Sequence, residues 1–476
     1  MKTPYFRPIA NAMIVSVTNL YIERGIHMKK TLAVLCVAVL LILSACGGTN
    51  TNQNAGGNDN APAAGQSGGG NSQASEQTSS GSTGEKKKLT FWFIDTGKRQ
   101  ELIQETVAQF MKDHPDVEVE AVQIPNDPYK TKLSVAMGGG NPPDIFHSWG
   151  GGWLKQFVTA GQVLELTGKI DEDSYIPSAL KVATFDGKIY GAPLLMGVVP
   201  VYYNKEIFAK YNLQPPKTYD ELLAIIDKLK QENIIPFALA NKTKWPGAFY
   251  LMYFANRIAG PEIFTEAFER KGRGFDDEAY VKAGEMIQDL VKRGAFNPGF
   301  NGLTYDTGQS RQLMYTGKAA MEIQTSSYIN NVRNESPDFE SKLGMFLFPE
   351  IEGGLGKATD MVGGISPVFS VYSKTKYPEE AVELVKALTS VELAQKMTDE
   401  ASAISAVKGV TYNDPFAKQL NEMLTQSTFV QTYYDQTLPP ELAELHKDTT
   451  QALFGETITP EEAARQMEEK AKEVLK

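Results

Sequence analysis

A tryptophan among glycines, Trp149 within residues 142–153, is the feature of this sequence that most clearly suggests binding chemistry. A double proline precedes a short apolar run, and Trp149 is followed by Gly150, Gly151 and Gly152. Glycine permits tight turns and the close approach of other molecules. An indole presents a flat apolar face with an N–H at one edge. The combination suits a flat, hydroxyl-rich ligand such as a sugar ring, although a core tryptophan beside a loop would give the same pattern.

Polar side chains also follow predicted strands at positions where a ligand could reach them. Asp95 and Thr96 come directly after a buried strand predicted at 88–94, and Ser148 and Trp149 follow the run that ends at His147. In parallel sheets the carboxyl ends of the strands face the ligand crevice. This placement favours a binding site over a core tryptophan.

The other tryptophans and one acidic residue have different predicted roles. Trp245 follows a strand predicted at 235–240 and is a second candidate for ligand contact. Trp92 lies inside a strand and Trp153 comes four residues after Trp149, so both are interpreted as packing residues. Asp144 follows the double proline, where it can either hold the turn or face a ligand.

Strands and helices alternate along the first part of the folded chain. Residues 101–114 carry an apolar face at positions 102, 103, 107, 110 and 111, and a strand predicted at 117–122 follows. Capping boxes are predicted at Thr218 with Glu221 and at Thr459 with Glu462. Alternation of this kind predicts parallel βαβ units and an α/β fold. The length of 476 residues fits two α/β halves better than one large sheet.

Composition excludes several classes of function. The net charge of −10 argues against nucleic acid and anionic lipid surfaces as main partners. The two cysteines, Cys36 and Cys46, lie near the N-terminus, so disulfides and thiolate metal sites are excluded from the rest of the chain. The four histidines have no zinc-binding spacing. No metal ion or cofactor is therefore expected.

The N-terminal region has the pattern of a secretory signal. Met28 begins a short positive stretch, residues 31–43 are apolar, and the run ends in Leu43-Ser44-Ala45-Cys46, which resembles the bacterial lipobox. We expect a signal peptide at 28–45, with Cys46 lipidated as the first mature residue. Residues 1–27 are interpreted as a mis-called upstream start. Residues 46–85 are rich in Gly, Asn and Ser and are predicted to form a flexible tether.

The folded part, 88–476, resembles the bacterial extracellular solute-binding proteins of ABC importers, family 1, the carbohydrate-binding group. The motifs that carry the resemblance run along the chain in the family's order, at 89–92 with 96–97, 129–133, 139–145, 149–152, 186–191, 203–205, 216–218, 244–246, 317–321, 348–349 with 353–354, 363–364, and 378–382. The resemblance implies a two-lobe periplasmic-binding-protein fold of type II. Its ligand cleft lies between lobes that are joined by two or three crossing segments. Lobe 1 would comprise 88–197 and 391–427, and lobe 2 would comprise 198–390 and 428–476.

The resemblance also implies ligand-binding residues, once the residues at strand ends are added. The expected set is Asp95, Thr96, Ser148, Trp149, Asn241, Trp245, Gln324, Ser326, Gly363, Gly364, Tyr434 and Asp435. The family commonly has a stacking tryptophan after the strand at 319–324, where this chain has Thr325-Ser326-Ser327. The missing ring argues against a long ligand.

The expected function is that of a lipid-anchored solute-binding component of an ABC importer, not an enzyme. The implied partners are a mono- or short oligosaccharide and the permease subunits. The protein would be a monomer that touches the membrane only through Cys46, on the outer face of the cell membrane. Residues 353–357 fail the phosphate-loop pattern and residues 364–368 fail the nucleophile-elbow pattern. A glycosidase-like carboxylate pair has no fixed spacing and stays open, as does a sugar sensor or adhesin that uses the same fold.

Overall fold

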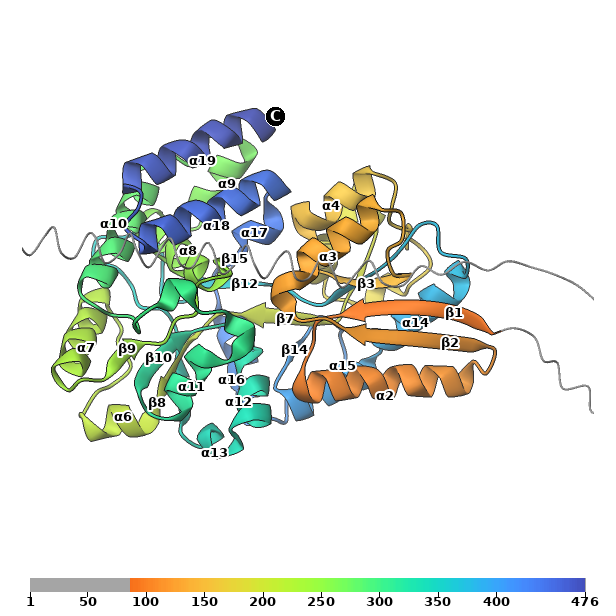
Figure 1. Ribbon diagram of the computed structural model, residues 1–476, viewed down its shortest axis with the longest axis horizontal. Helices are drawn as coiled ribbons and strands as arrows, with labels where there is room; N and C mark the ends of the chain where they lie inside the picture. The colour runs from red at the N-terminus through yellow and green to blue at the C-terminus, as the bar shows by residue number, and fades with distance from the viewer. Residues whose placement is uncertain (1–85, 476) are drawn as a thin grey trace, which may run out of the picture. The chain divides into compact units, whose positions relative to one another are not determined.

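The computed structural model describes residues 86–475, which form two α/β lobes and a small sheet that joins them (Figure 1). The predictions for the upstream start, the signal peptide, Cys46 and the tether to residue 85 concern residues outside this range. Among residues 86–475, no helix combines the length and the apolar character needed to cross a membrane.

Lobe 1 is built on a five-stranded sheet in the order β2-β1-β3-β13-β6. Its strands are Lys87–Phe93 (β1), Val117–Gln123 (β2), Ile145–Ser148 (β3), Ala192–Pro193 (β6) and Val368–Val371 (β13). Its helices are Gly97–Asp113 (α2), Asn126–Gly138 (α3), Gly151–Thr159 (α4), Pro177–Lys181 (α5), Pro378–Leu388 (α14) and Val391–Ala401 (α15). A 3₁₀ turn (Glu172–Ser174) and a hairpin of Thr184–Phe185 (β4) with Lys188–Ile189 (β5) complete it. Because β1 pairs in parallel with β2 and β3, the predicted βαβ arrangement is confirmed.

Lobe 2 is built on a four-stranded sheet in the order β11-β8-β10-β9. Its strands are Val201–Asn204 (β8), Ile235–Phe237 (β9), Ala319–Ile323 (β10) and Leu343–Phe346 (β11). Its helices before the last crossing are Lys205–Lys210 (α6), Tyr219–Gln231 (α7), Trp245–Ala259 (α8), Glu262–Glu269 (α9), Glu278–Lys292 (α10), Gln309–Tyr315 (α11), Tyr328–Glu335 (α12) and Pro337–Glu340 (α13), with 3₁₀ turns at Phe300–Gly302 and Tyr305–Thr307. The chain returns to it for Tyr434–Thr437 (α17), Pro440–Phe454 (α18) and Pro460–Val474 (α19).

Local sequence signals account for where many of these helices begin and what they bury. Helix α2 buries Leu102, Ile103, Val107 and Phe110, as its apolar spacing predicted. Helix α7 begins with the predicted capping box, in which Thr218 and Glu221 exchange hydrogen bonds. At α19 only half of the predicted box forms. Thr459 accepts from the backbone N–H of Glu462, while the Glu462 carboxylate accepts from the side chains of Arg465 and Gln466.

A third sheet, in the order β14-β7-β12-β15, forms the hinge between the lobes. Its strands are Leu195–Val198 (β7), Met361–Ile365 (β12), Ile404–Ser405 (β14) and Val430–Thr432 (β15). The chain passes from lobe 1 to lobe 2 through β7 and returns through β12. It crosses a third time through β14, helix α16 (Pro415–Gln426) and β15. Three segments therefore cross between the lobes.

The boundary expected at residue 390 differs from the strand pairing. Strand β13 pairs antiparallel with β3 and so belongs to the sheet of lobe 1, and α14 packs against α2 of the same lobe. Residues 368–388, which were expected in lobe 2, therefore lie in lobe 1. The physical reason is that β12 is itself the return crossing, so the chain is already back in lobe 1 when β13 begins.

Candidate functional site

Buried polar atoms without a hydrogen-bond partner in the protein mark the junction of the two lobes. Among residues 86–475, those at the junction are Asp95 Oδ2, Arg99 Nε and His147 Nδ1 from lobe 1, and Gln324 Nε2 and Asn330 Oδ1 from lobe 2. The carboxylate of Asp127 and the hydroxyl of Thr243 face each other across the junction. Burying an unpaired polar group costs about 1–3 kcal/mol. A set of such atoms on facing surfaces therefore defines a place where hydrogen bonds to a ligand would be gained.

The first part of the site lies at the ends of β1 and β3. Asp95 Oδ2 is 3.8 Å from His147 Nδ1. Burial lowers the pKa of His147 to about 3, so its imidazole is neutral at pH 7 and this contact is not an ion pair. Burial raises the pKa of Asp95, and the nearby guanidinium of Arg99 opposes that rise. Asp95 Oδ2 has no hydrogen-bond partner in the protein, so this oxygen can accept a hydrogen bond from a ligand hydroxyl.

An aromatic cluster surrounds Trp149. Its indole meets Tyr129, His147 and Trp153 edge-on, with ring centroids 5.7, 4.7 and 5.2 Å away. The Lys130 ammonium lies 4.9 Å from the indole centroid. Trp149 is only 6% exposed, as Trp153 is, and both belong to the same buried cluster, so the ring of Trp149 is held in one orientation. Trp153 is buried beneath it and stacks edge-on with Phe157, which confirms its interpretation as a packing residue.

The glycines after Trp149 allow the backbone of the opposite lobe to approach closely. A Cβ added to Gly151 would collide with the carbonyl oxygen of Gln436, and one added to Gly152 with that of Leu438. Residues 436–438 belong to the α17 segment of lobe 2. The N-terminus of α4 can therefore touch α17 only because these two positions carry no side chain.

Trp245 contributes the opposite aromatic wall from the first turn of α8. Its indole Nε1 donates to Asp127 Oδ1 of lobe 1 over 3.4 Å. The ring is held edge-on by Phe249 and Tyr305, with centroids 5.7 and 5.0 Å away. Trp245 thus reaches across the junction toward α3.

Three further polar contacts join the lobes. Lys130 Nζ donates to Asp435 Oδ2 over 2.9 Å, and the Asp127 backbone N–H donates to Asp306 Oδ2 over 2.9 Å. Asn330 Nδ2 donates to the Thr96 carbonyl over 2.9 Å. The lobes are therefore closed on each other, with charged groups on both sides.

The charges at the junction act in opposite directions on closure. Burial would raise the pKa of Asp435, but the charges of Lys130 and Lys447 hold it below its usual range, so this ion pair favours the closed arrangement. Burial raises the pKa of Asp127 and of Asp306. At Asp306 the hydrogen bond from the Asp127 N–H opposes that rise and the charge of Asp127 adds to it. Burying both carboxylates therefore opposes closure at neutral pH.

Three residues expected to bind ligand lie instead in the protein interior with partners of their own. Ser148 donates to the Val368 carbonyl over 3.0 Å within the sheet. Asn241 accepts from the Gly247 N–H over 3.0 Å and donates to Asn301 over 2.7 Å. Tyr434 stacks on Phe264 with ring centroids 4.1 Å apart. Ser148 ends β3, Tyr434 begins α17 and Asn241 lies in the loop between β9 and α8, but each side chain points into the interior.

The remaining expected residues lie at the hinge or beside it. Gln324 is fully buried, and its Nε2 has no partner, while the Ser326 N–H donates to the Val198 carbonyl of β7 over 2.8 Å. Gly363 and Gly364 lie in β12. A Cβ at Gly363 would lie 2.6 Å from the Gly197 carbonyl oxygen, and one at Gly364 would collide with the ring of Tyr433.

Asp144 serves the turn rather than the site. Its carboxylate accepts from the Thr90 N–H and hydroxyl over 2.8 and 2.9 Å, and from the Thr375 hydroxyl over 2.6 Å. Trp92 is partly buried in β1, with the Lys132 ammonium 4.8 Å from its ring. Its interpretation as a strand residue that packs against the lobe 1 core is confirmed.

Sequence reasoning missed six residues at the junction, which are Arg99, Asp127, Lys130, His147, Asn330 and Tyr433. Three of them, Arg99, Asp127 and Asn330, lie in the first turn of a helix that follows a strand. Four of the six are in helices α2, α3 and α12, one turn beyond the strand ends that the sequence pattern singled out. Tyr433 directly follows β15, and the resemblance pointed to the neighbouring Tyr434.

The comparisons with known proteins agree with this architecture. The family model of the bacterial extracellular solute-binding protein matches residues 95–395. A galactooligosaccharide-binding protein of Bacillus subtilis is 25% identical over 463 residues, 94% of this chain and 97% of that protein. The multiple sugar-binding protein of Streptococcus mutans is 24% identical over 365 residues, 74% of this chain and 83% of that protein. The chain belongs to the bacterial extracellular solute-binding protein family.

Solved structures share the two-lobe fold. One, from work on xylan utilization by the thermophilic bacterium Caldanaerobius polysaccharolyticus, has a TM-score of 0.75 and 34% identity, and the match covers 80% of this chain and 99% of that chain. A chitin oligosaccharide binding protein also has a TM-score of 0.75, with 25% identity, over 82% of this chain and 99% of that chain. The resemblance inferred from the sequence motifs is thereby confirmed at the level of family and fold.

We expect Lys130→Met and Asp435→Asn each to weaken ligand binding about five- to tenfold, because each removes a partly buried ion pair worth about 1 kcal/mol. The pKa of Asp435 is lowered in the closed form, so its contribution is present above about pH 4 and is lost as the pH falls through the lowered value. Titration calorimetry across pH checks this. Lys188→Met, which breaks an exposed pair with Glu165 inside lobe 1, is the control, and equal losses in all three variants would contradict the assignment.

Asp306→Asn is expected to act in the opposite direction and to tighten ligand binding at pH 7 about two- to fivefold. It removes a carboxylate charge that closure buries, and its amide oxygen can still accept from the Asp127 N–H. The pKa of Asp306 is raised in the closed form, so the cost of closure is present above the raised value and is relieved as the pH falls through it. The variant should therefore differ from the parent at pH 7 and converge with it at low pH.

The measurement is the dissociation constant between pH 4 and pH 7.5. Glu352→Gln removes an exposed carboxylate of the same lobe and should leave the dissociation constant unchanged. Weaker binding by the Asp306→Asn variant at pH 7 would show that the negative charge of Asp306 favours the ligand-bound form, against the prediction.

Proposed function

We propose that this chain captures a neutral mono- or short oligosaccharide between its lobes and delivers it to the permease of an ABC importer. The observation that carries the proposal is that buried polar atoms without a partner and two tryptophans, Trp149 and Trp245, lie at the same junction between the lobes. Relatives named for galactooligosaccharide, multiple sugars, and melibiose, raffinose and stachyose support the ligand class. A relative named as an ABC transporter extracellular-binding protein supports the role in import.

The residues match the chemistry of a sugar. A pyranose has C–H groups on its faces and hydroxyls around its rim. An indole that covers 40–60 Å² of one face contributes roughly 1–1.5 kcal/mol. The acceptors Asp95 and Asp127 and the donors Gln324 and Arg99 would read the hydroxyls, and a site built in this way rejects ligands that lack them.

The charge balance at the junction favours a neutral ligand. Each cation there has a carboxylate beside it, Arg99 near Asp95 and Lys130 bonded to Asp435. Asp127 and Asp306 carry further negative charge without a cation bonded to either. An anionic sugar would therefore meet net repulsion, whereas a neutral hydroxyl can donate to these carboxylates without a charge penalty.

The proposed ligand-binding set follows from this chemistry. From the sequence-based expectations it keeps Asp95, Thr96, Trp149, Trp245, Gln324, Ser326, Gly363, Gly364 and Asp435. To these it adds Arg99, Asp127, Lys130, His147, Asn330 and Tyr433. The Thr325 and Ser327 hydroxyls lie 2.7 Å apart where relatives of this family commonly have a ring, which limits the length of ligand that can stack. Tyr433, on the glycines of the hinge, offers the third aromatic surface instead.

Ligand and permease would be coupled through lobe closure. A ligand shifts an open–closed equilibrium only by its preference for the closed state, and here both lobes contribute groups to the ligand. The closed form of a monomer would be the species that the permease recognises. The members of the family named above are binding proteins, and we expect no turnover of the bound sugar.

A thermal-shift screen of residues 86–476 against neutral and acidic saccharides tests the function. A binder present at 100 times its dissociation constant should add about 2.7 kcal/mol to the free energy of unfolding. We expect stabilisation by a neutral xylo-, galacto- or chito-oligosaccharide or its monosaccharide, and none by the corresponding uronic acid. Stabilisation by a peptide or polyamine, with no response to any carbohydrate, would refute the proposal.

We further propose that Cys46 carries a lipid that anchors the chain to the outer face of the cell membrane, supported by the lipobox-like residues 43–46. Cys46→Ser should remove the anchoring thiol and move the protein from the membrane fraction to the medium. Fractionation followed by immunoblotting checks this, with Cys36→Ser as the control. Retention of the Cys46→Ser protein in the membrane fraction would contradict the anchor.

A further inference from the structure

The loop before Trp245, residues 241–244, has a backbone conformation that a side chain disfavours. Lys244 has φ of +72° and directly precedes Trp245 at the start of α8. For a residue with a Cβ this left-handed region costs free energy. Strain of this kind persists only where surrounding contacts impose it.

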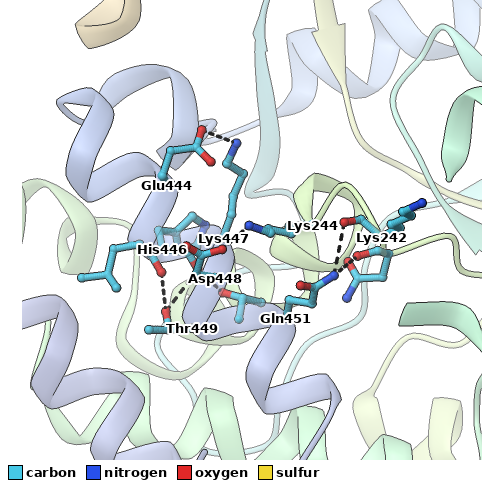
Figure 2. A network of polar contacts seen from close by, with 11 residues as sticks. Lys242, Lys244, Glu444, His446, Lys447, Asp448, Thr449 and Gln451 are labelled. Atoms are coloured by element: carbon cyan, nitrogen blue, oxygen red, sulfur yellow. Dashed lines mark hydrogen bonds and ion pairs between the residues drawn. The ribbon is translucent and has the colours of Figure 1, made fainter. Parts of the chain in front are cut away.

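Helix α18 supplies contacts that hold the loop. Gln451 Nε2 donates to the carbonyls of Asn241 and Lys242 over 2.6 and 3.3 Å, and Figure 2 shows its side chain directed at the loop. Lys244 forms an ion pair with Asp448, one turn earlier on the same helix. Two side chains of α18 thus bond to the loop, Gln451 at its first two residues and Asp448 at its last, Lys244.

Asn301 closes the arrangement into a ring of hydrogen bonds. Its Oδ1 accepts from Asn241 Nδ2 over 2.7 Å, and its Nδ2 donates to the Gln451 carbonyl over 3.3 Å. Asn241 in turn accepts from the Gly247 N–H over 3.0 Å in the first turn of α8. The loop and the start of α8 are therefore tied to one position on α18.

The same part of lobe 2 carries another contact across the junction. Asp435, in the short helix just before α18, bonds to Lys130 of lobe 1, and Trp245 bonds to Asp127 of lobe 1. A shift of α18 relative to α8 would therefore change both contacts together.

We propose that Gln451, with Asp448 and Asn301, forms a positioning set for Trp245. These residues lie away from the ligand and act by directing the indole toward lobe 1. The inference rests on the proposed function for its effect on affinity, whereas the orientation of the ring can be tested without any ligand.

Gln451→Met tests the inference in the full chain, because methionine keeps the side-chain length and removes the amide donor. The expected result is about a tenfold loss of affinity for the saccharide identified by screening, the size expected from losing hydrogen bonds to backbone carbonyls. Gln451→Lys, which restores a donor, should recover most of the affinity. Glu441→Gln, which loses an exposed pair with Lys470 at the other end of α18, is the matched control and should bind as the parent does.

A double-mutant cycle separates positioning from a general loss of structure. If Gln451 acts through the indole, Gln451→Met should have little further effect in a Trp245→Phe background, because coupled residues are non-additive. A loss as large in that background as in the parent would overturn the proposal.

A measurement without ligand distinguishes failure of the positioning role from failure of the proposed function. The fluorescence of Trp245 is obtained as the difference between the chain and its Trp245→Phe variant. After Gln451→Met, acrylamide should quench this fluorescence more strongly, because the indole is less firmly held and more exposed. Unchanged quenching overturns the positioning role whatever the ligand. Increased quenching in a protein that binds no saccharide would support the positioning role and refute only the proposed function.

Discussion

Contact between the lobes depends on backbone approaching backbone at places where no side chain fits. Gly151 and Gly152 lie against the carbonyls of the α17 segment, and Gly363 lies against Gly197 in the hinge. A Cβ at any of these positions would hold the two surfaces apart. Close approach removes water from the junction, and charges in a poorly hydrated region interact more strongly than in bulk solvent. The close approach of the lobes therefore strengthens the ion pair, and it also raises the free-energy cost of the facing carboxylates and of the unpaired polar atoms.

Interactions at the junction include some that favour the closed arrangement of the lobes and some that oppose it. The Lys130–Asp435 pair favours closure, while the facing carboxylates of Asp127 and Asp306 and the unpaired polar atoms oppose it. A sugar that supplies hydroxyl donors to carboxylates would relieve the opposing terms without disturbing the ion pair. Such a balance suits a protein that must both capture and release, because a ligand can shift an equilibrium only by the difference in its affinity for the two states.

Local patterns predicted the elements well and the side-chain directions poorly. The strand at 88–94 and the apolar face of α2 follow from periodicity, which acts within a few residues. The return of β13 to lobe 1 depends on antiparallel pairing with β3, some 220 residues away, and no local signal encodes it. Ser148 ends a strand, Tyr434 begins a helix and Asn241 lies in a loop, and packing turns all three side chains inward. Arg99 and Lys130 lie one helical turn further and face the junction.

The sequence by itself determined the family, the α/β class and the importance of the glycines and tryptophan at 149–152, because short-range patterns and recurring motifs are sufficient for these. Only the tertiary structure decided that Gly151 and Gly152 receive the opposite lobe, and that Trp149 lies against Lys130. It also decided that Trp245 is held by a helix some 200 residues later in the chain. These outcomes depend on contacts between segments remote in sequence, and the free energy of such contacts is set by packing that no local pattern records.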